Sequence, residues 1–372
     1  MNLALSDEQV FLREAARGAL ARVAGVAVAR AAADGEGRPD LWPTARQAGW
    51  PGLLISEGRG GAGLGVFDAM LVLQECGRVL AGVALLGHLP ATSLLEAAGR
   101  DGIEPLATGE RRAAWLPARP PCDVEPNWTT DPERGLARAP VPTAGLEGDQ
   151  AVVSGTVHWV PDAPGADVLI AVAVAGDEPV AVLLEANAAG VTVTEADRYD
   201  PTRSLGHVTL EGARGERLGV DTEQIAAAWY IAQSLIAAES IGSVEVALDA
   251  SVAYAKERHT FGRAIGSYQA IKHALTEVLR RLENGRSLLY YAGWSHTGAP
   301  DEFPLAASAA RSAAGRALDF ASSELIAVHG GIGATWEHDA PYFYRRAQLS
   351  RRLLGGTADA TDRVASRALA TV

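Results

Sequence analysis

Apolar residues recur at helical spacing over the first third of the chain. The positions that open this pattern are Val10, Phe11, Ala15, Leu20 and Val23. Intervals of three to four residues are typical of a helix with one buried face. Ser6 and Gln9 stand before them at the spacing of a capping box, in which each side chain binds the other residue's free backbone N–H. Similar patterns predict helices over 41–47 and 66–80.

The pattern changes between about residues 113 and 214. Prolines are frequent from 117 to 142 and exclude a long helix there. Short apolar runs follow, separated by Gly, Asp and Pro. The runs that predict strands are 151–153, 156–160, 168–174, 180–184, 191–194 and 206–210. Many short, evenly spaced strands are typical of a small antiparallel barrel or sandwich.

Helical spacing returns from about Thr222 and continues to Leu369. The segments that predict long helices are 225–254, 268–295, 305–328 and a last one from 341 onward. Several long helices in series favour a bundle. We therefore predict an α+β chain with a helical domain over 1–112, a β domain over 113–220 and a helical bundle over 221–372.

The composition makes several classes of protein poor candidates, namely those that bind nucleic acid or anionic lipid and those that span a membrane. The 372 residues include 33 Lys or Arg and 45 Asp or Glu, which gives a net charge of −12. An acidic chain without a basic block is a poor candidate for binding nucleic acid or anionic lipid. Its apolar runs fall short of the about 20 residues that span a membrane. Two cysteines exclude a disulfide framework, so we expect a cytoplasmic protein.

Three short sequence features are candidates for a cofactor, metal or catalytic site, and none of them supports such a site. The segment 58–63 matches G-x-G-x-x-G, but the βαβ context of a dinucleotide site is missing, so we predict a turn between helices. Glu337, His338 and Asp339 are adjacent, and adjacent residues point in different directions on a helix. We therefore expect no metal site. The chain also lacks the G-x-S-x-G motif of a serine hydrolase.

The stretch 254–273 is the most informative part of the sequence. Arg258 offers a fork of donors that suits a pyrophosphate. Phe261 can cover a flat ring, and Gln269 offers amide donors one turn into the next helix. The residues alone leave a second interpretation open, in which this is an ordinary helix hairpin with a charged corner.

At this stretch the chain resembles the acyl-CoA dehydrogenase family. The segments that carry the resemblance are 6–9, 60–64, 74–78, 154–160, 257–262 with Gln269, and 329–339. It implies an N-terminal helical domain, a middle antiparallel β-barrel and a C-terminal four-helix bundle. It also implies FAD as cofactor, an acyl-CoA thioester as substrate and an electron-transfer flavoprotein as acceptor. The FAD contacts that it implies are Arg258, Thr260, Phe261, Gln269, Gly331 and Trp159.

The catalytic base that the family uses is missing. In many members it is the Glu of a Tyr-Glu-Gly-Thr motif, and here Gly355 matches that position. In others it lies on the first bundle helix, where Ala232 stands, followed by Gln233. The catalytic residue is therefore unknown. Glu239 is a candidate substitute, but it lies about 10 Å along the helix from Ala232, and proton transfer needs contact at about 3 Å. Pairing with an arginine or lysine is the alternative.

The flavin-contacting parts are also reduced. The family's T-E-P loop has no counterpart between 120 and 140, Pro161 follows Val160 where a Thr is usual, and Ala327 replaces a Gln. Family members bind FAD across a subunit interface, and some actinobacterial members pair a catalytic with a degenerate subunit in a tetramer. The resemblance thus implies a subunit that contributes part of a shared FAD site. A self-sufficient homo-oligomer with an unusual base and a flavin-free structural or acyl-CoA-binding relative are the alternatives.

Overall fold

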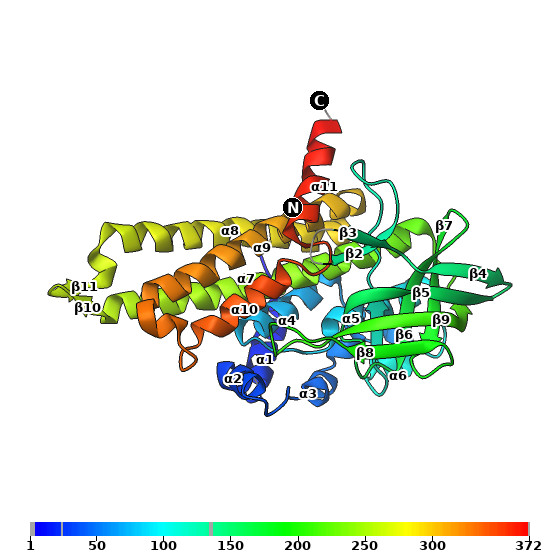
Figure 1. Ribbon diagram of the computed structural model, residues 1–372, viewed down its shortest axis with the longest axis horizontal. Helices are drawn as coiled ribbons and strands as arrows, with labels where there is room; N and C mark the ends of the chain where they lie inside the picture. Colours follow the sequence, from blue (N-terminus) through cyan, green and yellow to red (C-terminus); the bar gives the residue numbers. More distant parts are fainter. Residues whose placement is uncertain (1–3, 24, 134–136, 371–372) are drawn as a thin grey trace.

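Helices α1 to α6 form the first part of the computed structural model, which describes residues 4–23, 25–133 and 137–370 (Figure 1). Their bounds are α1 Asp7–Ala21, α2 Val26–Ala33, α3 Trp42–Gln47, α4 Val66–Arg78, α5 Leu85–Ala97 and α6 Glu104–Ala107. The predicted capping box is confirmed, because Gln9 N donates to Ser6 Oγ at 3.2 Å and Ser6 N donates to Gln9 Oε1 at 3.1 Å. The segment 58–63 is a turn before α4, and no strand precedes it within residues 4–23 and 25–57.

The strands of the middle part close into a barrel. Their bounds are β1 Ala113–Leu116, β2 Thr129–Glu133, β3 Ala137–Pro140, β4 Thr143–Glu147, β5 Gln150–Pro161, β6 Val168–Ala175, β7 Glu178–Glu185, β8 Val191–Glu195 and β9 Leu205–Arg217. The sheet runs β6-β4-β5-β9-β7 and closes where β7 pairs with β6, while β2 and β3 form a separate ribbon. The barrel prediction is confirmed, although β1 and β4 both pair with β6 in parallel.

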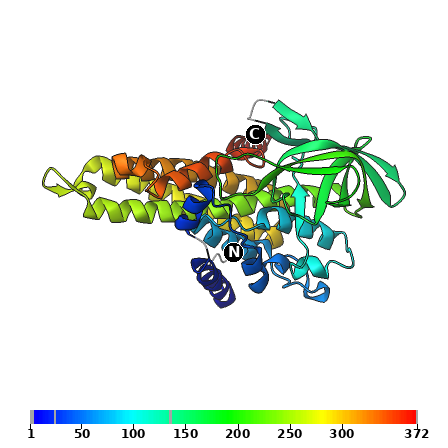
Figure 2. The same ribbon diagram turned by 60° about the horizontal axis from the view of Figure 1, so that its bottom comes forward.

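The third part is the helical bundle. Its helices are α7 Thr222–Glu257, α8 Gln269–Gly298, α9 Phe303–His329, α10 Ala340–Ser350 and α11 Gly356–Ala370. The short strands β10 His259–Thr260 and β11 Arg263–Ala264 form a hairpin between α7 and α8. Figures 1 and 2 both show this hairpin at one end of the molecule and the barrel at the other. The bundle core is built largely from alanine and leucine.

Helix α7 is the central element of the bundle. It is long and apolar enough to cross a membrane, with a mean hydropathy of 1.3 in its most apolar window, but 83% of that window is buried inside the protein. Glycines let α4 cross it closely. A Cβ on Gly77 would lie 1.9 Å from Glu239 O, and a Cβ on Gly242 would lie 1.9 Å from Gln74 O. Helix α7 is therefore a core helix against which the N-terminal part packs.

Asp162 joins the N-terminal helices to the barrel. It follows β5 with a left-handed φ of 61°, and its carboxylate accepts the Gly87 N–H of α5 at 2.9 Å. The residue is only 5% exposed. Burial raises the pKa of its carboxyl from the ordinary 3.8 to about 6, and the Gly87 hydrogen bond and nearby arginines offset only part of that shift. The negative charge at neutral pH is therefore a cost to the folded state.

Asp162→Asn should stabilise the protein at neutral pH. The native state holds the Asp162 proton more tightly than the unfolded state, so this carboxyl makes stability fall as the pH rises from about 4 to about 6. Above that window the asparagine variant should gain up to about 3 kcal/mol, and below about pH 4 the difference should vanish. Asparagine tolerates the left-handed backbone and still accepts the Gly87 N–H. Urea midpoints of both proteins across this pH range test the prediction, and an unchanged difference at all pH values contradicts it.

Candidate functional site

The two positions at which the family carries its base lie in one closed interior. Ala232 on α7 and the turn at Leu354 and Gly355, between α10 and α11, are all buried, and Ala232 and Leu354 have 0% exposure. The Gln233 side chain joins them, because its Nε2 donates to Leu354 O at 3.2 Å. Neither position carries an acid, and no surface of Ala232, Gln233 or Leu354 is left for a substrate to contact.

Backbone geometry fixes the turn between α10 and α11. Leu354, Gly355 and Gly356 have successive φ values of 52°, 73° and 69°, all in the left-handed region. A Cβ at Gly355 would lie 2.9 Å from the Asp359 side chain, and one at Gly356 would lie 2.4 Å from Arg351 O. Side chains larger than hydrogen are therefore strained at both glycines. This turn suits close packing and gives no room to a catalytic carboxylate.

A buried ionic cluster closes the neighbouring space. Asp359 on α11 accepts hydrogen bonds from Arg119, which follows β1, and from Arg363 Nε at 3.1 Å. Arg363 also donates to Tyr230 Oη on α7 at 3.1 Å and to the carbonyl of Pro120. Arg119 is 1% exposed and Asp359 is 1% exposed. The segment after β1, where the resemblance leads one to expect a flavin-contacting loop, is thus bound to this chain's own C-terminal helix.

Glu239 lies inside a second buried cluster. One carboxylate oxygen accepts from Arg203 and the other accepts from Arg346, which also binds Asp200. Burial acts to raise the pKa of Asp200, but the charges of Arg346 and Arg203 outweigh it and hold that pKa below its ordinary value. Glu239 is 2% exposed, and both of its oxygens are occupied. This arrangement ties α7 to α10 and to the loop before β9.

Four of the six sequence-predicted cofactor residues occupy the corner between α7 and α8. These are Arg258, Thr260, Phe261 and Gln269. Phe261 is 92% exposed, and its φ of 53° is left-handed, as is that of Gly262 at 78°. A non-glycine residue with such a φ is strained, and strain of this kind is typical of functional turns. Tyr268 Oη donates to Thr260 O at 3.0 Å and braces the hairpin.

The corner presents uncompensated positive charge. Within the described residues, the Arg258 guanidinium and the Gln269 amide have no hydrogen-bond partner, and both side chains are exposed. The stretch 256–273 holds four Lys or Arg residues and a single acid, Glu257. In a chain with a net charge of −12, this stretch therefore carries a local excess of positive charge.

Gly331 lies at the same end of the bundle as this corner. It belongs to the 3-10 turn Gly330–Ala334 that follows α9. The ring of His329, just before this turn, stacks on the ring of Tyr254 at 4.2 Å, and Tyr254 lies four residues before Arg258. Gly331 is exposed, as Arg258, Phe261 and Gln269 are. Five of the six predicted cofactor residues therefore share one end of the molecule.

Trp159 lies apart from the other five. It interrupts β5 with a φ of 57°, at a bulge in the pairing with β9, and its ring meets the His207 ring edge-on at 5.0 Å. The barrel that carries it and the hairpin that carries Arg258 are at opposite ends of the long axis (Figures 1 and 2). A single chain does not bring the two halves of the predicted FAD site together.

Sequence reasoning missed the residues that close the interior. Arg119 and Asp359 are 240 positions apart, and Arg346 lies 107 positions from Glu239. No local pattern relates such partners. The available signal was the presence of charged residues among apolar ones, as with Glu239, which indicates a buried pair without naming its partner.

Comparisons with known proteins agree with this architecture. The N-terminal domain of acyl-CoA dehydrogenases matches residues 6–119, and the C-terminal domain matches residues 226–369. Acyl-CoA dehydrogenase IpdE2 of Mycolicibacterium smegmatis is 31% identical over 94% of this chain and 96% of its own length. IpdE2 of Mycobacterium tuberculosis is also 31% identical, over 97% of both chains.

Solved structures give the same result. A variant of the Tcur3481-Tcur3483 steroid ACAD superposes with a TM-score of 0.85 at 27% identity, over 98% of this chain and 99% of that one. The ChsE4-ChsE5 complex from Mycobacterium tuberculosis has the same fold, with a TM-score of 0.87 at 24% identity over all of both chains. The chain therefore belongs to the acyl-CoA dehydrogenase family, the FAD-dependent oxidoreductases that act on acyl-CoA thioesters.

Proposed function

We propose that this chain is a non-catalytic subunit of a heteromeric acyl-CoA dehydrogenase. In this proposal it lends the exposed corner at Arg258 and Phe261 to an FAD held mainly by a partner subunit. The observation that carries the proposal is the contrast between two regions. Four of the residues that match cofactor contacts are exposed at one end of the bundle, namely Arg258, Phe261, Gln269 and Gly331, whereas both positions that match the base are buried and carry no acid.

The chain's own residues would bind the cofactor and leave the proton transfer to the partner. FAD, when bound, supplies an acceptor for the hydride that leaves the β carbon of the acyl-CoA. Arg258 would donate charge-assisted hydrogen bonds to its pyrophosphate, and Gln269 would add amide donors. Phe261, held outward by its turn, would cover an aromatic ring. Removal of the α proton requires a carboxylate in contact with the substrate, and the partner would provide it.

Glu239 does not fill the role of base in this proposal. A base must contact the substrate, but Glu239 is 2% exposed and its carboxylate is bound by two arginines inside the protein. The self-sufficient homo-oligomer is therefore the less supported alternative. The relatives described as a steroid ACAD and as the ChsE4-ChsE5 complex support a two-component assembly with a steroid-derived acyl-CoA as substrate. An electron-transfer flavoprotein would take up the electrons.

Co-expression with a candidate catalytic subunit tests the proposed function. This chain purified alone should be colourless, and the co-purified assembly should be yellow and should oxidise an acyl-CoA. Light scattering of the assembly at micromolar concentration should give a mass above that of a monomer, because symmetric association completes the cofactor site. A yellow and active homo-oligomer would establish the self-sufficient alternative, and an assembly that stays colourless with every partner would establish a flavin-free relative.

Gly355→Glu should not create a working base. The left-handed backbone at this position costs a non-glycine residue about 1–3 kcal/mol, and the new Cβ would meet Asp359. Gly176→Glu is a matched control, because Gly176 also has a left-handed φ, of 65°, but no atom within 4 Å of an added Cβ. Urea unfolding should show a larger loss in the free energy of unfolding for Gly355→Glu than for Gly176→Glu. Acyl-CoA oxidation by this variant, in an assembly whose partner lacks its own carboxylate, would refute the proposed closed interior.

A further inference from the structure

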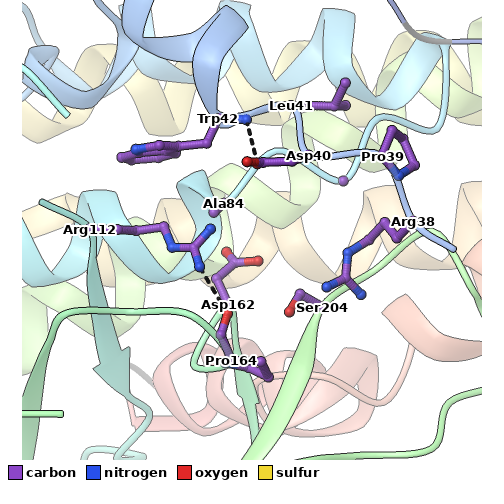
Figure 3. Close-up of a pocket in the computed structure, with 11 residues that line it drawn as sticks. Arg38, Pro39, Asp40, Leu41, Trp42, Ala84, Arg112, Asp162, Pro164 and Ser204 are labelled. Carbon is purple, nitrogen blue, oxygen red and sulfur yellow. Dashed lines mark hydrogen bonds between the residues drawn. The ribbon is translucent and has the colours of Figure 1, made fainter. Parts of the chain in front are cut away.

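A polar cavity lies between the N-terminal helices and the barrel, next to Asp162. Its volume is about 210 Å³. The polar residues and the one aromatic residue that line it are Arg38, Asp40, Trp42, Arg112, Asp162 and Ser204. None of these belongs to the corner at Arg258 or to the closed interior around Ala232. Figure 3 shows these side chains converging from separate segments of the chain.

The Ser204 hydroxyl and the Asp162 carboxylate of this cavity have fewer partners than buried polar groups normally have. Ser204 is 7% exposed, and its hydroxyl has no hydrogen-bond partner among the described residues. Asp162 is 5% exposed and accepts the Gly87 N–H, yet in the part of the chain that the structure describes it forms no ion pair with an arginine. Buried polar groups and charges are normally hydrogen-bonded or paired. These two exceptions indicate that a bound ligand supplies the missing partners of Ser204 and Asp162.

Two arginines approach the same space from opposite walls. Arg38 comes from the segment before α3. Its Nη1 donates to Arg203 O at 3.3 Å and lies 3.5 Å from Glu195 Oε1, whereas the structure gives no partner for its Nη2 among the described residues. Arg112 is the residue just before β1. Its Nη2 donates to Pro164 O at 3.0 Å, and its Nε is buried without a partner among the described residues. Each guanidinium is thus held in place with donors to spare. In Figure 3 Asp162 and Ser204 lie between the two.

The charges of the lining residues indicate which class of ligand the cavity would bind. A plain anion would suit Arg38 and Arg112 but would meet the charges of Asp40 and Asp162, and a plain cation would have the opposite conflict. We propose that the cavity binds a small hydroxy- or amino-carboxylate. Its carboxylate would accept from the two arginines, and its hydroxyl or ammonium group would donate to Asp162. The Ser204 hydroxyl would complete the contacts. The volume lies below the about 300–1,000 Å³ of pockets for drug-sized ligands, so the ligand is small.

Calorimetric titration of the full-length wild-type protein tests this inference, with L-lactate and L-serine as probes. Acetate has the carboxylate without the donor, ethanolamine has the donor without the carboxylate, and inorganic phosphate is a plain anion. Lactate or serine should bind at least about tenfold more tightly than all three. Equal or tighter binding of phosphate or acetate would mean a simple anion site and would overturn the proposal, as would no binding of either probe.

Variants locate the binding. Arg112→Gln and Ser204→Ala should each reduce the affinity for the tighter-binding probe by at least about tenfold. Arg22→Gln, at an exposed position of the N-terminal part, should leave it unchanged. Binding that survives Arg112→Gln would place the ligand elsewhere and refute the inference. The comparison of probes on the wild-type protein decides the question even where a variant fails to fold. The outcome is independent of the proposed subunit function, because the titration measures neither flavin nor turnover.

Discussion

Arg346→Ala is expected to destabilise the protein by about 3–5 kcal/mol, the typical cost of breaking a buried ion pair from one side. Arg346 has 0% exposure and binds Asp200 and Glu239, and it also donates to Leu80 O at 3.1 Å. Its removal leaves two carboxylates in the interior with reduced compensation. Urea unfolding, followed by circular dichroism, should show a much lower midpoint for the variant.

An exposed ion pair provides the control for Arg346. Arg280 pairs with Glu277 on the surface of α8, where the two side chains are 59% and 31% exposed. Exposed pairs contribute about 0–1 kcal/mol, so Arg280→Ala should leave the midpoint nearly unchanged. Arg346→Lys keeps one charge but loses the fork of donors, and it should fall between the alanine variant and the wild type. Equal midpoints for Arg346→Ala and Arg280→Ala would contradict the role given to the buried cluster.

Arg258→Ala is expected to reduce FAD binding by the assembly without unfolding this chain. A charge-assisted hydrogen bond contributes about 1.5–3 kcal/mol, which corresponds to a loss of affinity of about 10- to 150-fold. Arg258 is exposed, and within the described residues its guanidinium binds nothing in its own chain. The substitution should therefore leave the urea midpoint of the isolated chain unchanged. The ratio of flavin to protein after dialysis of the assembly measures the effect.

Arg22→Ala is the matched control for this experiment, because Arg22 is also exposed but lies at the end of α1, far from the corner in sequence and in the fold. It should retain the flavin of the wild-type assembly. Full flavin content in Arg258→Ala would refute a contact between this corner and the cofactor. A lower flavin content together with a lower urea midpoint would instead assign Arg258 to the folding of the hairpin.

Much of the architecture could be predicted because it rests on local patterns. The capping box at Ser6 depends on two residues three positions apart, and it forms as predicted. The apolar runs from 151 to 210 lie in strands, although two of them join in β5 across the bulge near Gly155. Strand β1 escaped prediction, because its four residues stand beside a proline-rich segment and pair with β6, more than fifty positions later. Its parallel pairing is set by the barrel as a whole.

The candidate site also has one part that local sequence predicts and one part that depends on distant contacts. The corner from Arg258 to Gln269 is one continuous stretch, so the sequence could name its residues as candidate pyrophosphate contacts. The residues alone left an ordinary charged hairpin as the alternative, and the resemblance to the family favoured the first interpretation. The state of the interior depends on partners far apart in the chain. Gln233 reaches Leu354 across 121 positions, and Arg119 reaches Asp359 across 240. The sequence could identify the missing acids at Ala232 and Gly355, but it could not say what occupied their space.

The order of helices, strands and bundle, the resemblance to the family, and the absence of a carboxylate at both usual base positions could all be predicted from the sequence. They follow from the hydrophobic period and from short contiguous motifs. The structure was needed to show that the base positions are buried, that Glu239 is bound by two arginines, and that the barrel with Trp159 and the hairpin after Arg258 lie at opposite ends. Burial and ion pairing depend on which distant segments pack together, and the balance between desolvation and charge attraction is settled only at those contacts.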